Sequence, residues 1–323
     1  MRDRGRRWRL LAAAGLLVLA PVLVAAQVPS TRPSVAVDPA RRLDDVLGAS
    51  EPGTRLGVWV GGPDGPAWYA RDADVSRPVA SAIKTAYLIE LFTVHADALD
   101  APLSGIDEFL SDSHPAVAHF TADQRDEIRR GLREATVRTI GHHMIRGTGV
   151  SNVVYNAAAN VTTASLGGPA RLTGRIHARD PAFGDLAVRR YMLAARDVTG
   201  DNEATPRGLA AVLQRVAARA IPGVAPTTVE AIRDVLRTDE ADQPDAHYAK
   251  TGSLDSDPLI RIRSGFLETP AGIIVYVVMG ERPGPGSLDR GEAGRRLEAT
   301  VEATTDALVS AARDARGTPP SMP

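Results

Sequence analysis

Strand-like segments lie near both ends of this chain, and a long stretch of helical periodicity separates them. Residues 55–60 alternate like a strand, residues 61–65 read Gly-Gly-Pro-Asp-Gly and predict a turn, and residues 67–70 begin a return strand. Three further strands are predicted towards the C-terminus, at 247–251, 262–268 and 272–279. This order favours a mixed sheet that is completed from both ends of the chain, with a helical insert between them.

Helical patterns fill the insert and close the chain. We predict helices near 81–96, 121–146, 153–166, 168–177 and 206–219, and a charged amphipathic helix over roughly 287–314. The chain has 323 residues, of which 44% are hydrophobic, so it can bury a sizeable core.

The composition excludes several classes of function. The formal net charge is −1 and charged residues make up 24% of the chain, which argues against the basic surface of a nucleic-acid-binding protein. The chain has no cysteine, which excludes disulfides, Cys-ligated zinc and a thiol nucleophile.

The N-terminus reads as an export signal. Arginines within residues 2–9 precede an apolar run at 10–24 and the small residues Ala25 and Ala26. A transmembrane helix needs about 20 apolar residues, so we predict cleavage near Ala26, with an uncleaved membrane anchor as the alternative. We therefore expect an extracytoplasmic protein, either secreted or in the periplasm or cell envelope. The predicted organisation is a signal peptide at 1–26, a Pro-rich tether at 27–45, one domain at 46–315 (an α/β part at 46–80 and 225–315, a helical part at 81–224) and a disordered tail at 316–323.

Only two of the 38 basic residues are lysines, Lys84 and Lys250. Lysine can lose its proton near neutral pH in a suitable environment and arginine cannot, so this arginine-rich chain is expected to keep lysine where that property matters. Lys84 ends the pattern Ser81-Ala-Ile-Lys84 at the start of a predicted helix, where positions i and i+3 share a face. A neutral amine there could act as the base for Ser81. Taken alone, the pattern fits equally well an N-cap serine followed by a solvated lysine.

Lys250 begins the motif Lys250-Thr251-Gly252-Ser253 at the end of a predicted strand. The lysine offers a positive charge, the two hydroxyls offer hydrogen-bond donors, and the glycine lets a substrate lie close against the strand. A strand that simply ends in a turn is the alternative. Both lysines of the chain fall in these two motifs, at opposite ends of the helical insert, and chance placement would rarely produce this coincidence.

Together these motifs resemble the serine β-lactamase and penicillin-binding protein superfamily, and class A β-lactamases most closely. The resemblance covers roughly residues 50–313. It includes Asn156-Ala-Ala-Ala-Asn160, the Gly-Gly-Pro at 167–169, and the stretch 201–206, which looks like the end of that family's Ω-loop. It implies an α+β fold of the three-layer α/β/α type, with a five-stranded antiparallel sheet flanked by N- and C-terminal helices and an all-helical subdomain.

The resemblance also implies a role for each matching residue. Ser81 would be the acylated nucleophile, Lys84 its activating base, and Asn156 the residue that holds the substrate amide. The backbone N–H groups of Ser81 and Ser253 would form the oxyanion hole. The substrate carboxylate would be bound by the second motif, which comprises Lys250, Thr251, Gly252 and Ser253.

Two departures from the family pattern bear on turnover. The family's Ser-Asp-Asn triplet reads Val154-Tyr155-Asn156 here, and valine cannot relay a proton to the leaving nitrogen. Ser151 or Tyr155 could supply the lost hydroxyl, and a plain loop or packing role is the alternative for each.

The second departure lies in the Ω-loop. The family carries a glutamate there that activates the deacylating water, whereas the corresponding stretch 188–192 reads Val-Arg-Arg-Tyr-Met. Glu203 sits at the wrong end of the loop and is expected to pair with an arginine. Without that base, an acyl-enzyme at Ser81 should turn over slowly.

Further candidates are weaker. Arg261 or Arg263 could bind a substrate carboxylate, although arginines are common throughout the chain. The scattered histidines are expected at the surface or in caps, and no metal or other cofactor is implied.

We therefore predict an exported serine hydrolase that acts on β-lactams or related acyl-D-alanine amides. The alternatives are a penicillin-binding or D,D-peptidase-like enzyme that deacylates slowly, and a non-catalytic protein that binds β-lactams or peptidoglycan. The expected partner is a β-lactam or a peptidoglycan peptide. We expect no nucleic acid, no membrane contact beyond an uncleaved signal, and a monomer.

Overall fold

The computed structural model describes residues 45, 48, 53–238, 245–284 and 289–317. All of these belong to one compact unit that spans Val37–Pro323. The predicted signal peptide, the tether apart from Asp45, and residues 318–323 of the predicted tail lie outside the described residues. Within the described part, no helix combines the length and the apolar character needed to cross a membrane.

The sheet draws its strands from both ends of the chain, as the sequence order predicts. It has five strands in the order β2-β1-β7-β6-β5, and every neighbouring pair is antiparallel. The N-terminal hairpin joins the C-terminal strands through β1 and β7, where Val58 lies opposite Val278. The five strands are β1 (Arg55–Gly61), β2 (Ala67–Arg71), β5 (Ala246–Leu254), β6 (Leu259–Thr269) and β7 (Gly272–Arg282).

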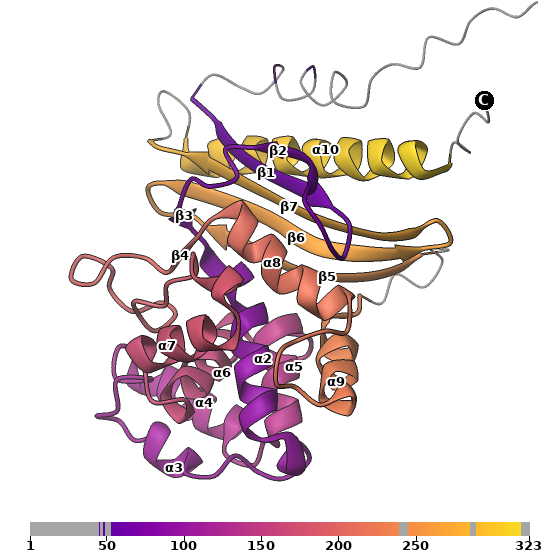
Figure 1. Cartoon of the computed structure of the whole chain (residues 1–323). Helices are drawn as coiled ribbons and strands as arrows, with labels where there is room; N and C mark the ends of the chain where they lie inside the picture. Colours follow the sequence, from indigo (N-terminus) through magenta and orange to yellow (C-terminus); the bar gives the residue numbers. More distant parts are fainter. Residues whose placement is uncertain (1–44, 46–47, 49–52, 239–244, 285–288, 318–323) are drawn as a thin grey trace, which may run out of the picture. The chain divides into compact units, whose positions relative to one another are not determined.

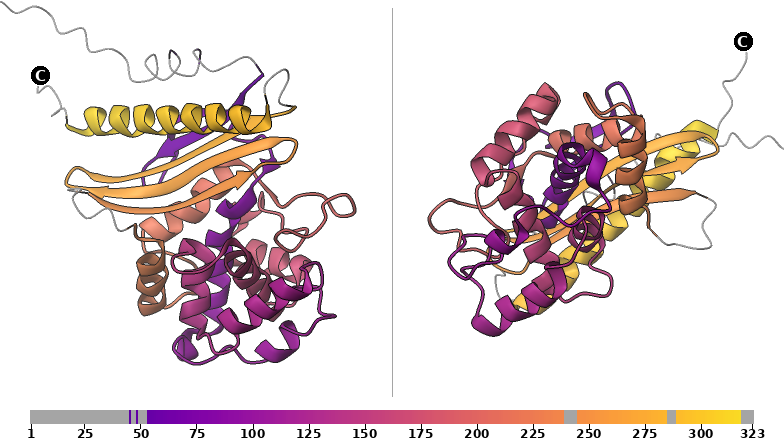
Figure 2. Two further views of the ribbon diagram at one scale, coloured as in Figure 1. Left: turned by 180° about the vertical axis from the view of Figure 1, so that it is seen from behind. Right: turned by 90° about the horizontal axis from the view of Figure 1, so that it is seen from below.

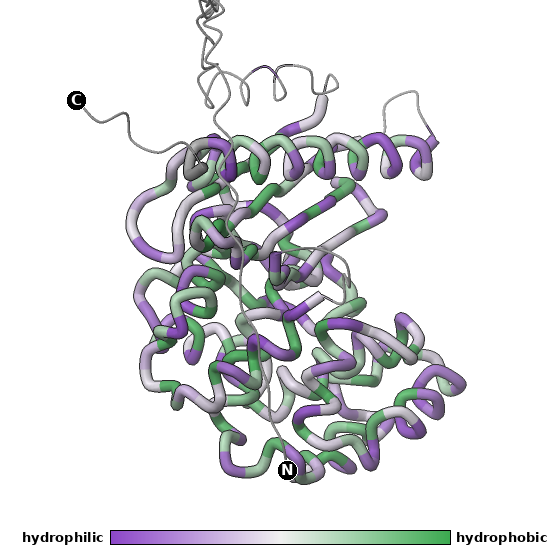
Figure 3. Tube along the Cα trace, turned by 90° about the vertical axis from the view of Figure 1, so that its right-hand side faces the viewer, coloured by the Kyte–Doolittle hydropathy of each residue, from purple (hydrophilic) through white to green (hydrophobic). Residues whose placement is uncertain are grey.

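One face of the sheet is covered by the long C-terminal helix α10 (Arg290–Gly317), which lies along the strands in Figure 1. Hydrophobic and hydrophilic residues alternate along this helix (Figure 3), so one side can face the sheet while the other stays hydrated. Val58 and Val278 from the sheet form a core with Leu297 and Val301 from the helix, and all four side chains are at most 1% exposed.

The other face carries α8 (Pro206–Ala217) and, beyond it, the helical part (Figures 1 and 2). Helix, sheet and helix therefore form three layers, and the predicted fold class is confirmed. The remaining elements are β3 (Arg77–Pro78), η1 (Ala80–Ile83), α2 (Lys84–Val94), η2 (Ala96–Ala98), α3 (Ile106–Phe109), α4 (Ala122–Leu132), α5 (Val137–Arg146), α6 (Asn152–Ser165), α7 (Pro169–Arg179), η3 (Pro181–Phe183), β4 (Glu203–Ala204) and α9 (Pro226–Leu236).

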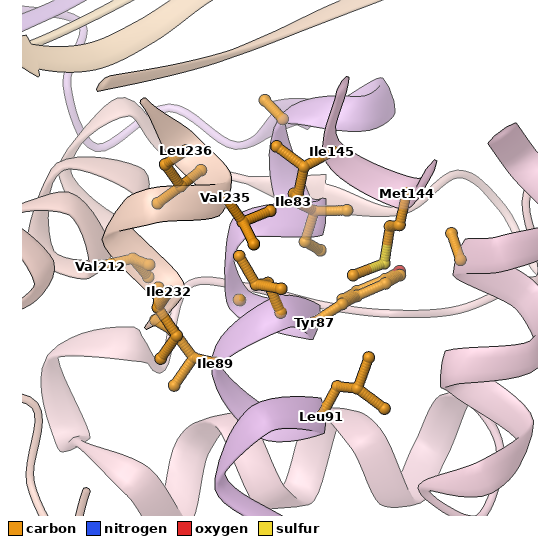
Figure 4. Packing of buried hydrophobic residues seen from close by; sticks show 14 of the residues in the cluster. Ile83, Tyr87, Ile89, Leu91, Met144, Ile145, Val212, Ile232, Val235 and Leu236 are labelled. Atoms are coloured by element: carbon orange, nitrogen blue, oxygen red, sulfur yellow. The ribbon is translucent and has the colours of Figure 1, made fainter. Parts of the chain in front are cut away.

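Helix α2 runs through the centre of the helical part. Its residues are apolar on all sides, and everything from Lys84 to Phe92 is buried. Figure 4 shows Ile83, Tyr87 and Ile89 packed against side chains from α5, α8 and α9. The segment that carries the first sequence motif is thus fixed by the main core.

Three element predictions need correction. The helix predicted over 121–146 is two helices, because Thr136 accepts a hydrogen bond from the backbone N–H of Thr139 and so caps a new helix. Helix α9 was not predicted, and it packs against α2 and α5 of the helical part, inside the stretch assigned to the α/β part. Helix α10 continues to Gly317, two residues into the predicted tail.

Candidate active site

Ser81 lies in η1, a short 3-10 helix that leads directly into α2. The residue before it, Ala80, has a φ of 46°, a left-handed conformation that a non-glycine residue seldom adopts. Such strain persists only where the surrounding structure enforces it, and it is common at functional sites. Ser81 is half-buried and lines a cavity next to these elements.

Lys84, one turn after Ser81, has a fully buried side chain with 0% exposure. Its Nζ donates a hydrogen bond to Asn156 Oδ1 at 3.0 Å, and it has no acidic partner among the described residues. Burial and then the nearby positive charge of Lys250 lower the pKa of Lys84 well below its ordinary value. This direction of shift favours the neutral form of the amine that follows Ser81 by one helical turn.

Asn156 is held from the other side by Asn152, on the first turn of α6. Asn156 Nδ2 donates to the Asn152 carbonyl at 2.9 Å and to Asn152 Oδ1 at 3.0 Å. Both polar atoms of the Asn156 side chain are thus engaged. The Asn156 Oδ1 has a second lone pair that can accept a hydrogen bond from a substrate amide N–H. Asn152 orients this side chain and is therefore a further site residue that the sequence motif did not reveal.

Tyr155 brings the two lysines together. The Lys84 Nζ lies 3.3 Å from the centroid of the Tyr155 ring, and the Lys250 Nζ lies 5.2 Å from it. Lys250 comes from β5 and is only 6% exposed, so the two motifs that are 166 residues apart in sequence (250 − 84) meet around one aromatic ring.

The open edge of β5 lies against η1. An added Cβ at Gly252 would stand 3.0 Å from Ala82 N and 3.2 Å from Ser81 N, so only glycine permits this approach. His247 O accepts from Thr238 N across the free edge. Because backbone groups alternate along a strand, the N–H of Ser253 also points out of that edge. The backbone N–H groups of Ser81 and Ser253 therefore come from two segments in direct contact.

The structure separates the candidates for the missing hydroxyl. Ser151 is exposed and caps α6, where its Oγ accepts a bond from Val154 N at 3.3 Å. Val154 is 3% exposed and points towards α4, since an added Cβ at Gly131 would lie 2.9 Å from it. The Val154 side chain therefore packs in the core and is not among the residues that line the cavity. Of these residues, Tyr155 lines the cavity.

The cavity holds about 750 Å³ and lies between η1, the start of α6, the end of β5 and the loop before β4. We call residues 188–202 the pocket loop. The lining residues are Ala80, Ser81, Asn152, Tyr155, Asn156, Arg190, Met192, Leu193, Ala194, Ala195, Arg196, Asp201, Asn202, Thr251, Gly252, Ser253, Leu254, Asp255 and Ser256. Thr251, Gly252 and Ser253 are thus brought beside Ser81, as expected, and Lys84 and Lys250 lie just behind the wall.

Met192 is the residue of the pocket loop that Asn160 fixes in the cavity wall. Asn160 Oδ1 accepts from Met192 N at 2.5 Å, and Asn160 Nδ2 donates to Met192 O at 3.1 Å. The Met192 carbonyl also bonds His119 Nε2 at 3.0 Å. The loop stretch without a glutamate therefore contributes Met192 to the lining of the cavity.

Asn202 ties this loop to the nucleophile segment, a link that sequence analysis missed. Its Oδ1 accepts from the backbone N–H groups of Arg189 and Arg190 at 2.8 and 3.0 Å, and its own carbonyl accepts from Val79 N at 2.9 Å. Asn202 is 4% exposed. Its position immediately before the two-residue strand β4 offered no sequence signal for these contacts.

The cavity lining contains two carboxylates among the described residues, and both are bound by arginine. Asp201 pairs with Arg190 at 2.6 Å and with Arg196 at 3.1 Å, while Asp255 pairs with Arg261 at 2.6 Å. Both carboxylates are therefore engaged in ion pairs.

Two predictions about other charged residues can be judged. Glu203 pairs with Arg189 at 2.7 Å, so its predicted structural pairing with an arginine is confirmed. The suggestion that Arg261 or Arg263 binds a substrate carboxylate is wrong. Both arginines reach to the helix side of the sheet, where they pair with Glu298 of α10 at 3.2 and 3.5 Å. Among the described residues, no group of three or more His, Asp or Glu side chains could hold a metal ion.

Known structures share this fold. The chain is similar to a β-lactamase from Sphaerobacter thermophilus at 20% identity and a TM-score of 0.60, over 87% of this chain and 97% of that one. It is also similar to an ancestral class A β-lactamase (20% identity, TM-score 0.61, 85% and 100% of the chains) and to the TLA-1 extended-spectrum β-lactamase (14%, 0.63, 84% and 98%). No protein-family model and no curated protein sequence matches the chain. The chain therefore has a β-lactamase-like fold, and these identities establish the fold alone.

Proposed function

We propose that this protein is a serine enzyme that β-lactams or acyl-D-alanine amides acylate at Ser81, and that it hydrolyses the resulting ester slowly. The observation that carries the proposal is the fully buried Lys84, which has no acidic partner within the described part of the chain and lies one turn after Ser81. A buried, neutral amine is the group that a serine nucleophile needs as its base.

In the acylation step, Lys84 takes the proton from the Ser81 hydroxyl as Oγ attacks the carbonyl carbon. The N–H groups of Ser81 and Ser253 stabilise the negative charge on the oxygen, an effect typically worth ~10²–10³ in rate. The C–N bond then breaks, and the leaving nitrogen receives the proton from Lys84, directly or through the hydroxyl of Tyr155. Tyr155 is favoured over Ser151 for this relay because it lines the cavity and its ring lies next to the Lys84 Nζ, whereas Ser151 caps α6 outside the cavity lining.

Lys250 supplies the charge that attracts the substrate carboxylate, with Thr251 beside it. Lys250 is the other lysine of the site and also has no acidic partner among the described residues. This pairing would be charge-assisted and therefore stronger than a neutral hydrogen bond.

Deacylation is expected to be the slow step. A water molecule that attacks the ester needs a base, and both carboxylates that line the cavity are paired with arginines. This observation favours a penicillin-binding or D,D-peptidase-like enzyme over an efficient β-lactamase. The exported location remains part of the proposal and rests on the sequence of residues 1–26.

Intact-protein mass spectrometry tests the proposal. The protein is mixed with a penicillin and a chromogenic cephalosporin, and the adduct is followed over time. We expect a long-lived adduct that disappears in Ser81→Ala. An adduct that persists in Ser81→Ala refutes the nucleophile assignment, and rapid release of product by the wild type refutes slow deacylation. No adduct in the wild type would favour a binding role instead.

A further inference from the structure

We infer that Arg175 and Arg179 form a binding site for a phosphate group, in a cavity separate from the one that Ser81 lines. This second cavity holds about 390 Å³ and lies between α2, α7 and the loop that joins α8 to α9. It shares no lining residue with the cavity at Ser81. The inference does not rest on the proposed acylation, and it adds a second class of ligand to the one that the proposed function assigns.

Arg179 is held in the wall of this cavity by a buried ion pair with α2. Its Nε donates to Glu90 Oε1 at 2.9 Å, and its Nη2 donates to Glu90 Oε2 at 3.0 Å. Its Nη1 donates to the carbonyl oxygen of Pro222 at 3.1 Å. The Glu90 side chain is 2% exposed, so the pair has a fixed place in the fold. A guanidinium has five N–H groups, and two of those on Arg179 have no acceptor among the described residues.

Arg175 supplies a second positive charge, one turn before Arg179 on the same face of α7. It is exposed, it lines the cavity, and its side chain makes no hydrogen bond or ion pair with another described residue. Arg215 of α8, by contrast, pairs with Asp180 at 2.6 Å. The five N–H groups of Arg175 are therefore available to a ligand in the cavity.

The charges of the cavity lining favour an anion. Arg175 and Arg179 contribute two positive charges and Glu90 contributes one negative charge, so the net charge of the lining is +1 (2 − 1). Positions i and i+4 of a helix are about 6 Å apart along the axis, which allows two long side chains to reach one small ligand.

The arrangement of the remaining donors favours a phosphate group over a carboxylate. Glu90 already takes the Nε–Nη2 edge of Arg179, so the N–H groups left on Arg179 do not form a fork that a planar carboxylate could match. A phosphate group has oxygens in tetrahedral directions. It can therefore accept from Arg175 on one side and from the outer N–H groups of Arg179 on the other.

The test is a calorimetric titration of the full chain with inorganic phosphate at physiological ionic strength. We expect saturable binding at one site. The dissociation constant should rise about tenfold or more in Arg175→Gln, because hydrogen bonds to a charged group typically contribute roughly 10- to 100-fold. Arg175→Lys should give an intermediate affinity, since it keeps the charge and loses the planar fork. Arg179 is left unchanged, because its removal would leave the buried Glu90 carboxylate without a partner.

Arg171→Gln is the matched control. Arg171 is exposed, lies one turn before Arg175 on α7, and does not line the cavity, so this variant removes the same charge from the same helix. Its dissociation constant should stay within about threefold of the wild type, because salt screens a charge that does not contact the ligand.

A second ligand identifies the source of the phosphate group. Glycerophosphoglycerol is the headgroup of phosphatidylglycerol without its acyl chains, and it carries a phosphodiester. Tighter binding of this ligand than of inorganic phosphate, lost in Arg175→Gln, would assign the site to a lipid headgroup; the reverse order would assign it to free phosphate. Equal weakening in Arg175→Gln and Arg171→Gln overturns the inference, as does the absence of saturable binding of both ligands up to about 10 mM. Labelling of Ser81 by a penicillin is a separate measurement, so either result leaves the acylation proposal standing.

Discussion

Met192→Glu should convert the protein from a slow into a fast deacylating enzyme. Met192 lines the cavity, is 7% exposed, and has its backbone fixed on both sides by Asn160. Glutamate is unbranched and of similar length, so its carboxylate would lie where the thioether now lies. Burial would raise the pKa of this carboxylate towards the working pH, which suits a general base.

The magnitude follows from what a positioned base contributes. General base catalysis is typically worth ~10²–10⁴ in rate, which corresponds to about 2.7–5.4 kcal/mol of activation free energy at 1.36 kcal/mol per tenfold. The buried polar group would lower the free energy of unfolding by about 1–3 kcal/mol. Deacylation should therefore accelerate at least about 100-fold, with the fold retained.

The assay labels the protein with a penicillin, removes the excess, and follows loss of the adduct by mass. Met192→Gln is the matched control, because it has the same shape and no basic oxygen. The acylation rate of each variant reports whether the site is intact. If the Glu and Gln variants acylate normally and lose the adduct at the same rate, the pocket loop does not face the ester and our account of slow turnover is incorrect.

Three further outcomes are expected. Lys84→Arg should reduce the acylation rate nearly as much as Ser81→Ala, because arginine keeps the positive charge but cannot give up its proton. Normal labelling of this variant by a penicillin would exclude Lys84 as the base. The acylation rate should rise with pH as Lys84 deprotonates, with a midpoint well below the ordinary lysine pKa. Lys250→Met should move this midpoint to higher pH, because the positive charge of Lys250 is one cause of the lowered pKa of Lys84. An unmoved midpoint in a pH–rate profile would contradict this coupling. Gly252→Ala should slow acylation by about 10-fold or more, because its Cβ would meet Ala82 N at 3.0 Å and force β5 away from η1. Single-turnover kinetics at the wild-type rate would show that acylation does not need this contact.

The sequence carried enough information for the fold and for part of the site. The strand patterns at both ends predicted that the sheet is completed from both ends of the chain, and the two lysines located the segments that meet around Tyr155. These are local signals, since each motif is contained in four consecutive residues. The chemical roles of Ser81, Lys84 and Lys250 stay predictions.

The contacts that complete the site could not be read in this way. Asn202 Oδ1 accepts hydrogen bonds from the backbone N–H groups of Arg190 and Arg189, which lie 12 and 13 residues earlier in the chain. A loop sequence carries no pattern that predicts contacts at this spacing. The start of α6 was an available signal, because Ser151 before an apolar run is typical of an N-cap. Applying it would have placed Val154 on the core side of the helix. Thr136 is a similar signal for the break between α4 and α5.

The burial of α2 from Lys84 to Phe92 has a consequence for how the protein responds to mutation and to solvent. Because the residues from Lys84 to Phe92 are buried, the amide hydrogens of this stretch should exchange with deuterium only through global unfolding, whereas those of the pocket loop should exchange through local opening. We therefore expect Ser81 and Lys84 to lie in or beside a rigid part of the molecule, and the pocket loop to be less stable against local opening. Substitutions that alter the substrate range can accumulate in the pocket loop with little change in the free energy of unfolding. Substitutions in α2 are expected to lower the stability of the whole domain.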